Sequence, residues 1–490
     1  MKEKLANGAL LLGAAKGLTV LLGLLSTFLL ARLLTPEDFG LFAVATLLLS
    51  VMGPVTELSL SSALIQQRAL SEDHFHTSWT LGMFRGALVA LVFVGAAPFV
   101  ADYYNDQRLI EIMLAIGASI LISGAANPKL ALFARNLNFW PSFAISVGQK
   151  LAGVLVGVIA AFIYRSYWAL LLGTLATQIA MVVISYSVVR YRPRFSLGKA
   201  RELLSFSIWL TLGKIINTIN WKLDHFFVAL FQGPKILGLY VMGDNLASMP
   251  TREVVGPIEQ TLFPGLAAVA DDKERLRRTY QRAQGLITAI VLPIGLVFAL
   301  HAQPLVLLVL GAQWQGAVII VQVLAAIFAV QTLGSMAQAL AMAKGQTKLM
   351  FYRDLVGFGM RVPIISYGAF TGGLIGIVYA RAVTGIIGIF INLFVVRQLL
   401  QLSIWAQIKN SWRSLLSGVF MAAISMCWAG RLEFFGVILS LFISCTVALA
   451  SYALCHLAFW FLTGRPQGAE SDMWDLLRKK IPGFKRTPNQ

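Results

Sequence analysis

Apolar stretches about 20 residues long recur along the chain, and they restrict its fold more than any other feature. A helix that crosses a bilayer needs roughly 20 mainly apolar residues. Hydrophobic residues make up 58% of the 490 residues and charged residues only 13%, with a mean hydropathy of +0.75. This composition excludes an ordinary soluble domain. Fourteen stretches meet the criterion, near 7–31, 40–64, 78–100, 109–126, 143–163, 167–189, 203–231, 239–265, 284–309, 316–342, 353–371, 373–396, 412–430 and 434–462. The sequence therefore predicts an all-α polytopic membrane protein with about 14 transmembrane helices.

Positive charge predicts the orientation of these helices. The chain has 40 Lys+Arg against 22 Asp+Glu, a net charge of +18. In a soluble protein this charge would suggest a nucleic-acid partner, but in a membrane protein it gathers in cytoplasmic loops. With the N-terminus inside, 27 basic residues fall in inside segments and five in outside loops, and the inside segments include 190–201 and 271–282. We therefore expect both termini in the cytoplasm, membrane lipids as partners, and no nucleic acid. The opening segment, which lacks a small-residue cleavage site, is expected to be a membrane helix.

The two halves of the sequence resemble each other at a shift of 198 positions. Lys16 then coincides with Lys214, Pro36 with Pro234, and Gly40 with Gly238. Six helices per half bring both halves into the membrane from the same side, which predicts a parallel repeat about an axis along the membrane normal. The expected domains are an N-terminal lobe (1–195), a C-terminal lobe (196–400), two additional helices (401–463) and a basic amphipathic cytoplasmic tail (464–490).

Eight basic residues fall within predicted spans and outside the first three residues at either end. At such a depth a charge costs at least ~2.5–3.5 kcal/mol and usually faces a cavity or a partner. Five acids that lie as far inside the spans cannot neutralise all of them. We therefore expect a cationic, water-filled cavity for an anionic substrate, with ion pairing as the alternative for each residue. Lys150 and Lys222 are assigned to snorkelling or pairing. The candidate substrate-binding residues are Lys16, Lys214, Arg252, Arg361, Arg85 and Arg381.

Acidic and histidine side chains in the spans are candidates for ion coupling. These are Asp224 and His225, which are adjacent in one span, and Glu57. Elsewhere, His74 and His76 follow Asp73 in an inside loop, where a polar loop is favoured over a metal site. No Walker motif or familiar catalytic pattern is present. We expect a protein that is not an enzyme and has no cofactor or metal.

Three segments carry a recognisable pattern: ARLLTPEDFGLFAVA (31–45), ALIQQ (63–67) and LALFARNLNFW (130–140). They resemble the polysaccharide transport family of Wzx-type flippases, in particular its branch for colanic acid and other exopolysaccharides. The similarity extends from about residue 5 to 400, and ARLLTPEDFG is its most specific part. The family belongs to the multidrug/oligosaccharidyl-lipid/polysaccharide exporter superfamily.

The resemblance implies two six-helix lobes that work by alternating access in the bacterial inner membrane. It implies a substrate of undecaprenyl-pyrophosphate-linked oligosaccharide, moved from the inner to the outer leaflet for exopolysaccharide or lipopolysaccharide biosynthesis. Polysaccharide polymerase and glycosyltransferases are the implied protein partners. Relatives hold the diphosphate with arginines and lysines of a central cavity, but no family motif fixes the individual cations of this chain.

Two other functions remain open. A multidrug exporter of the same superfamily would favour acidic cavity residues, whereas bases outnumber acids in these spans. A membrane-embedded polysaccharide polymerase or ligase would present catalytic groups on a sizeable outside loop, and each predicted outside loop is short.

Overall fold

The computed structural model describes residues 2–56, 64, 70–135, 138–205, 208–428 and 436–464. Each regular element in these ranges is a helix, as the hydropathy predicts. The chain divides into two compact units, Met1–Val241 and Met242–Gln490. The lobe boundary near residue 195, which rests on the sequence repeat, stays a prediction, and the predicted amphipathic tail lies outside the described residues apart from Gly464.

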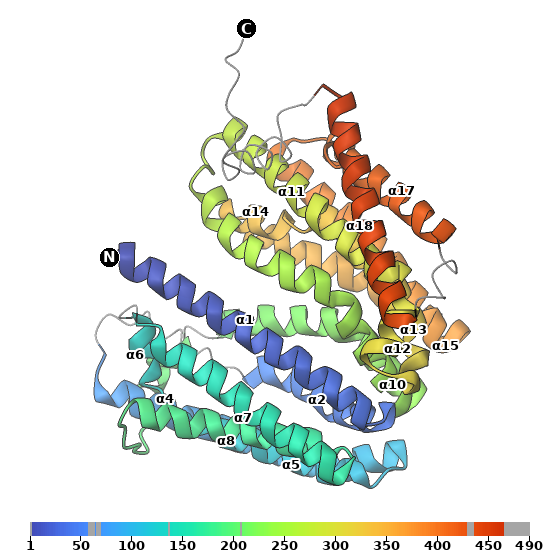
Figure 1. The fold of residues 1–490 in the computed structure, drawn as a ribbon. Coiled ribbons are helices and arrows are strands. Elements are labelled where there is room, and N and C mark those ends of the chain that lie inside the picture. Colours follow the sequence, from blue (N-terminus) through green and yellow to red (C-terminus); the bar gives the residue numbers. More distant parts are fainter. Residues whose placement is uncertain are drawn as a thin grey trace. The chain divides into compact units, whose positions relative to one another are not determined.

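The first unit is built from long helices that pack through small residues. α7 and α8 lie side by side, and α1 packs along α7 (Figure 1). A Cβ atom at Gly173 of α8 would lie 3.2 Å from the Cα atom of Gly157 in α7, so glycine permits this close approach. The helices are α1 (Lys2–Leu33), α2 (Pro36–Thr56), α4 (Glu72–Tyr104), α5 (Arg108–Gly124), α6 (Leu130–Arg135), α7 (Trp140–Tyr164), α8 (Trp168–Val188), α9 (Ala200–Ser205) and the first part of α10 (Ile208–Ala267).

Thr35 and Asp38 form the corner between α1 and α2. The Asp38 amide donates to the Thr35 hydroxyl at 3.2 Å, and the Thr35 amide donates to the Asp38 carboxylate at 3.0 Å. This reciprocal pair caps the first turn of α2, and Pro36 occupies the position where a missing N–H costs nothing. The buried Asp38 carboxylate also accepts from the backbone N–H of Tyr167 at 3.0 Å, which ties this corner to the α7–α8 loop.

Charged residues join the start of α2 to the α4–α5 loop. The Arg108 guanidinium pairs with Glu37 and also contacts the Asp106 carboxylate at 2.6 Å. Its hydrogen bonds hold the pKa of Asp106 below its usual range. In the α7–α8 loop, burial raises the pKa of Tyr167 to about 12, and its hydroxyl donates to Glu111. These pairs, with the cap at Thr35, give the segment TPEDFG a structural role at one end of the unit.

Gly40 of α2 packs directly against α10. A Cβ atom at Gly40 would overlap the carbonyl of Pro234, and a Cβ atom at Gly238 would overlap the carbonyl of Pro36. The contact is therefore reciprocal, and it joins the residues that the 198-position shift pairs. Gly233, with φ 79° and ψ 177°, interrupts α10 directly before this contact. Only a glycine adopts this backbone conformation readily, so it permits the chain to reverse between two helical stretches.

The basic segment after α8 is held against the start of α4. The Ser196 amide donates to the Thr80 hydroxyl at 3.0 Å, and the Ser196 hydroxyl donates to the Asp73 carboxylate at 3.1 Å. His76 Nδ1 lies 2.9 Å from the Tyr191 hydroxyl, and His74 Nε2 lies 3.2 Å from the Glu202 carboxylate. The residues 73–76, predicted to form a polar loop, are the first turn of α4 instead, and this turn is a docking point for the extended segment. No group of three or more potential metal ligands converges among the described residues.

In the second unit, α11 is the helix that most other elements contact. Its buried side chains pack with α13, α14 and α15, and α17 and α18 cover another part of it (Figure 1). The three cysteines, on α17 and α18, are free thiols. The elements are the rest of α10, α11 (Lys273–Leu300), α12 (Ala302–Val309), η1 (Ala312–Ala317), α13 (Val318–Gln331), η2 (Thr332–Gly334), α14 (Ala337–Ala343), α15 (Thr347–Leu400), α16 (Ile404–Asn410), α17 (Trp412–Trp428) and α18 (Val437–Leu462).

Two predicted spans differ from the structure. The span 284–309 is divided at His301 into α11 and α12. The span 316–342 begins at the end of the 3₁₀ segment η1 and is interrupted by a second one, η2. At the second of these, the Gln284 side chain donates to the Thr332 carbonyl at 2.6 Å, which satisfies an acceptor where the α-helical pattern is broken. A Cβ atom at Gly334 would lie 2.8 Å from the Asn392 side chain, so α15 passes close to this break.

Ten helical stretches of the described residues are long and apolar enough to cross a membrane. One of them, 348–400, contains the non-helical Gly373 and covers two predicted spans; another, 218–256, contains Gly233. α5 and α17, with 17 residues each, are shorter than the 18 residues of this criterion. The chain is therefore a multi-pass membrane protein, while the count of fourteen and the parallel repeat stay predictions.

Candidate functional site

Lys16 lies in the middle of α1, in the first unit. Its side chain is exposed on the surface of the unit, and its ammonium group makes no ion pair with a described residue. Lys214, its partner in the sequence repeat, lies in α10, but its side chain is outside the described residues. The structure therefore leaves one of the two predicted cations unneutralised and gives no geometry for the other.

The four predicted arginines have different surroundings. Arg252 is exposed on α10, and its Nε donates to the neighbouring Glu253 carboxylate at 3.0 Å. Arg85 on α4 and Arg361 on α15 are partly buried. Arg381 is only 3% exposed, and its Cζ atom lies 5.6 Å from the centre of the Phe328 ring. This cation–π contact packs Arg381 between α13 and α15.

Asp224 and His225, predicted for ion coupling, lie in a buried cluster of the first unit. Their exposures are 2% and 4%, and His225 Nδ1 lies 3.2 Å from the Asp224 carboxylate. The hydroxyl of the fully buried Tyr240 donates to the same carboxylate at 2.6 Å. Such a carboxylate can hold a proton or a small cation. Glu57, the third candidate, lies outside the described residues.

Tyr240 is a member of this cluster that the sequence analysis did not assign to a site. It lies sixteen residues after Asp224, across the reversal at Gly233, so only the folded chain brings the two together. Its ring also packs edge-on against His225, with ring centres 5.3 Å apart. The sequence singled out Tyr240 only indirectly, as the residue that the 198-position shift pairs with Phe42. That pairing does not indicate a contact with Asp224.

Comparisons with known proteins agree on the type of protein. The model of a family described as "Polysaccharide biosynthesis protein" matches residues 29–319. The chain is 25% identical to the lipopolysaccharide biosynthesis protein WzxC of Escherichia coli (strain K12), over 81% of each chain. It is 25% identical to the succinoglycan biosynthesis transport protein ExoT of Rhizobium meliloti (strain 1021), over 71% of each chain. The family model covers most of the first unit and part of the second.

A solved structure resembles the fold over almost all of the chain. It is the lipid II flippase MurJ in an inward closed conformation, with a TM-score of 0.73 and 16% sequence identity. The alignment covers 92% of this chain and 99% of that one. At this identity the likeness concerns the fold alone.

Proposed function

Because the chain belongs to the polysaccharide biosynthesis protein family, we propose that it is a flippase for undecaprenyl-pyrophosphate-linked oligosaccharide units. The single observation that carries the substrate class is the ammonium group of Lys16, which lies within a membrane helix and has no ion pair with a described residue. The relatives are named for the biosynthesis or transport of surface polysaccharides. The chain itself is a membrane transport protein of polysaccharide biosynthesis; the lipid-linked substrate is the proposal.

The physical need for such a protein follows from the substrate. A diphosphate and a hydrophilic glycan lose their hydration in hydrocarbon at a prohibitive cost. Lysine and arginine side chains in a water-filled cavity replace that hydration with charge-assisted hydrogen bonds. The polyprenyl tail stays in lipid while two six-helix lobes, 1–195 and 196–400, alternate in their access to the two sides. Lys16, Lys214, Arg252 and Arg361, with Arg85 and Arg381, are the residues proposed to line this cavity.

Deletion of the gene tests this function. The lipid-linked oligosaccharide should then accumulate in the inner leaflet, and the intact chain supplied in trans should clear it. An exporter of organic cations is the alternative, favoured by the buried carboxylate of Asp224. If the chain is such an exporter, deletion of its gene would leave the amount of lipid-linked oligosaccharide unchanged and raise the sensitivity of the cells to cationic drugs. That result would contradict the flippase function.

The cluster of Asp224, His225 and Tyr240 is proposed to couple transport to a proton or cation gradient. The Asp224→Asn variant should lower transport about tenfold. Asparagine carries no charge, so the charge-assisted hydrogen bond of the carboxylate, worth about 1.5–3 kcal/mol, is lost. Tyr240→Phe removes only one donor and should have a smaller effect. The measurement is lipid-linked oligosaccharide transport in membrane vesicles with and without an imposed gradient. If Asp224→Asn responds to the gradient as the wild type does, the coupling role is excluded.

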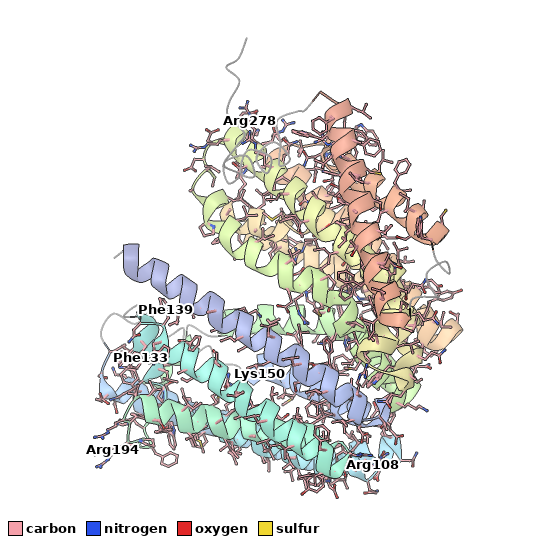
Figure 2. The ribbon with its side chains drawn as sticks, viewed as in Figure 1. Arg108, Phe133, Phe139, Lys150, Arg194 and Arg278 are labelled. Carbon is pink, nitrogen blue, oxygen red and sulfur yellow. The ribbon has the colours of Figure 1, made fainter. Side chains whose placement is uncertain are left out.

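Both termini are proposed to lie in the cytoplasm. Figure 2 shows Arg108 and Arg194 at opposite ends of the first unit, in keeping with their predicted outside and inside positions. Reporter fusions after residue 105 or 432 should therefore behave as external, and fusions after residue 195 or 275 as internal. External labelling of the segment 190–201 in intact cells would contradict this orientation.

A further inference from the structure

Lys150, which the sequence analysis assigned to snorkelling or pairing, lies deep within α7. It comes ten residues after Trp140, where the helix begins, and fourteen before Tyr164, where it ends. At 1.5 Å per residue the two ends are about 15 and 21 Å away. Figure 2 shows Lys150 between the two ends of the first unit. The four-carbon stem of lysine is shorter than either distance, so the ammonium group cannot reach an interface by extension.

No acidic side chain of the described residues forms an ion pair with Lys150. Its side chain is half-buried, and its ammonium makes neither an ion pair nor a hydrogen bond with the described part of the chain. On α1 the Lys150 side chain faces Gly23. A Cβ atom at Gly23 would lie 3.4 Å from Cε and 3.5 Å from Nζ of Lys150. The ammonium group therefore occupies a notch that the absent side chain leaves on α1.

Lys16 and Gly23 share one face of α1. They are seven residues apart, a rotation of almost two whole turns, and about 10 Å apart along the axis. The face of α1 that carries Lys16 thus also receives Lys150, and neither lysine has an ion pair within the described residues. An isolated charge at this depth is costly unless water or an anion compensates it.

We propose that Lys150 and Lys16 form an anion site at the seam of α1 and α7, which binds the diphosphate of a polyprenyl lipid. This inference rests on the proposed flippase function and adds Lys150 and the Gly23 notch to the substrate-binding residues. Two compact ammonium groups on flexible stems suit a diphosphate, because each can donate to a different phosphate group. A resident anionic phospholipid has the same phosphate chemistry, and the experiment separates the two.

The test uses the purified full-length protein in nanodiscs of neutral lipid, titrated with inorganic pyrophosphate. Lys150→Gln should weaken pyrophosphate binding about tenfold or more, whereas Lys150→Arg should retain part of the affinity. Lys222→Gln is the matched control, since it removes a lysine from a different span, outside the proposed site. The affinity of this variant for pyrophosphate should equal that of the wild type. Thermal unfolding of each variant verifies that it is folded.

Gly23 provides a second pair of variants that keeps both charges. Gly23→Ala adds an atom at ordinary contact distance from Lys150 and should bind pyrophosphate as the wild type does. Gly23→Leu fills the notch and displaces the ammonium group, so its binding should be several times weaker. These variants decide the question even if Lys150→Gln does not fold.

Equal pyrophosphate affinity in wild type, Lys150→Gln and Gly23→Leu would overturn the proposal. If neither wild type nor variants bind pyrophosphate, but Lys150→Gln loses co-purified phosphatidylglycerol, the site holds a resident phospholipid and the proposed ligand is wrong. A separate assay of lipid-linked oligosaccharide transport by the wild-type protein tests the flippase function. If the wild-type protein does not transport lipid-linked oligosaccharide, but its binding of pyrophosphate depends on Lys150, the flippase function is refuted and the anion site is not.

Discussion

Glutamine at Lys16, Lys214, Arg252 or Arg361 should reduce polymer export about tenfold or more in each single variant, while the protein stays inserted and stable. The loss follows from the removal of a charge-assisted hydrogen bond of about 1.5–3 kcal/mol to the diphosphate. Arginine in place of either lysine should restore part of the export, because the charge is kept although its geometry changes. The measurement is polymer export normalised to the amount of protein in the membrane.

Structural pairing predicts a different pattern for the same four variants. Loss of one partner would destabilise the protein, and removal of the acidic partner as well would restore it. For Arg252 the acid to test is Glu253, whose carboxylate lies 3.0 Å from Nε. Normal export from all four glutamine variants would exclude the cationic cavity.

Alanine at Gly40 or at Gly238 should destabilise the protein by about 1–3 kcal/mol, since the added Cβ atom overlaps the backbone of the facing helix. Backbone cannot move aside as a flexible side chain does, so α2 and the facing part of α10 must separate. The same separation accommodates the second alanine. The double variant should therefore lose much less stability than the sum of the losses in the two single variants. Thermal unfolding of the purified protein measures all three values.

Gly53→Ala and Gly256→Ala are matched controls on the same two helices. No described atom lies within 4 Å of a Cβ atom at either position, so both should unfold within a few degrees of the wild type. Strict additivity of Gly40→Ala and Gly238→Ala, or stability equal to that of the controls, would show that the close contact is absent in the membrane.

The positions of the helices were largely predictable from the sequence, because transmembrane helices require long apolar stretches. The predicted spans 143–163 and 167–189 correspond to α7 and α8 within a few residues. The break after α13 was not predicted, since 316–342 contains neither a charged residue nor a proline. It depends on a tertiary contact, the hydrogen bond from Gln284 to the Thr332 carbonyl.

The candidate site was less predictable. The sequence indicates which cations lie in spans, but not which have a partner, because pairing depends on residues that are distant along the chain. Lys150 is the example: only the folded chain shows that it faces Gly23 of another helix and that it makes no ion pair with a described residue. The buried position of Arg381 against Phe328 likewise depends on the packing of α13 and α15.

The reciprocal contact at Gly40 and Gly238 has the geometry of a subunit interface. In a homodimer with a two-fold axis, residue i contacts j of the other subunit, and j contacts i. Pro36 against Gly238 and Pro234 against Gly40 reproduce this arrangement between two sequence-matched segments of one chain. A substitution in a true homodimer changes both copies of a contact together, whereas here it changes only one. A substitution can thus change one half of the contact and leave the other half unchanged, which is impossible in a symmetric homodimer.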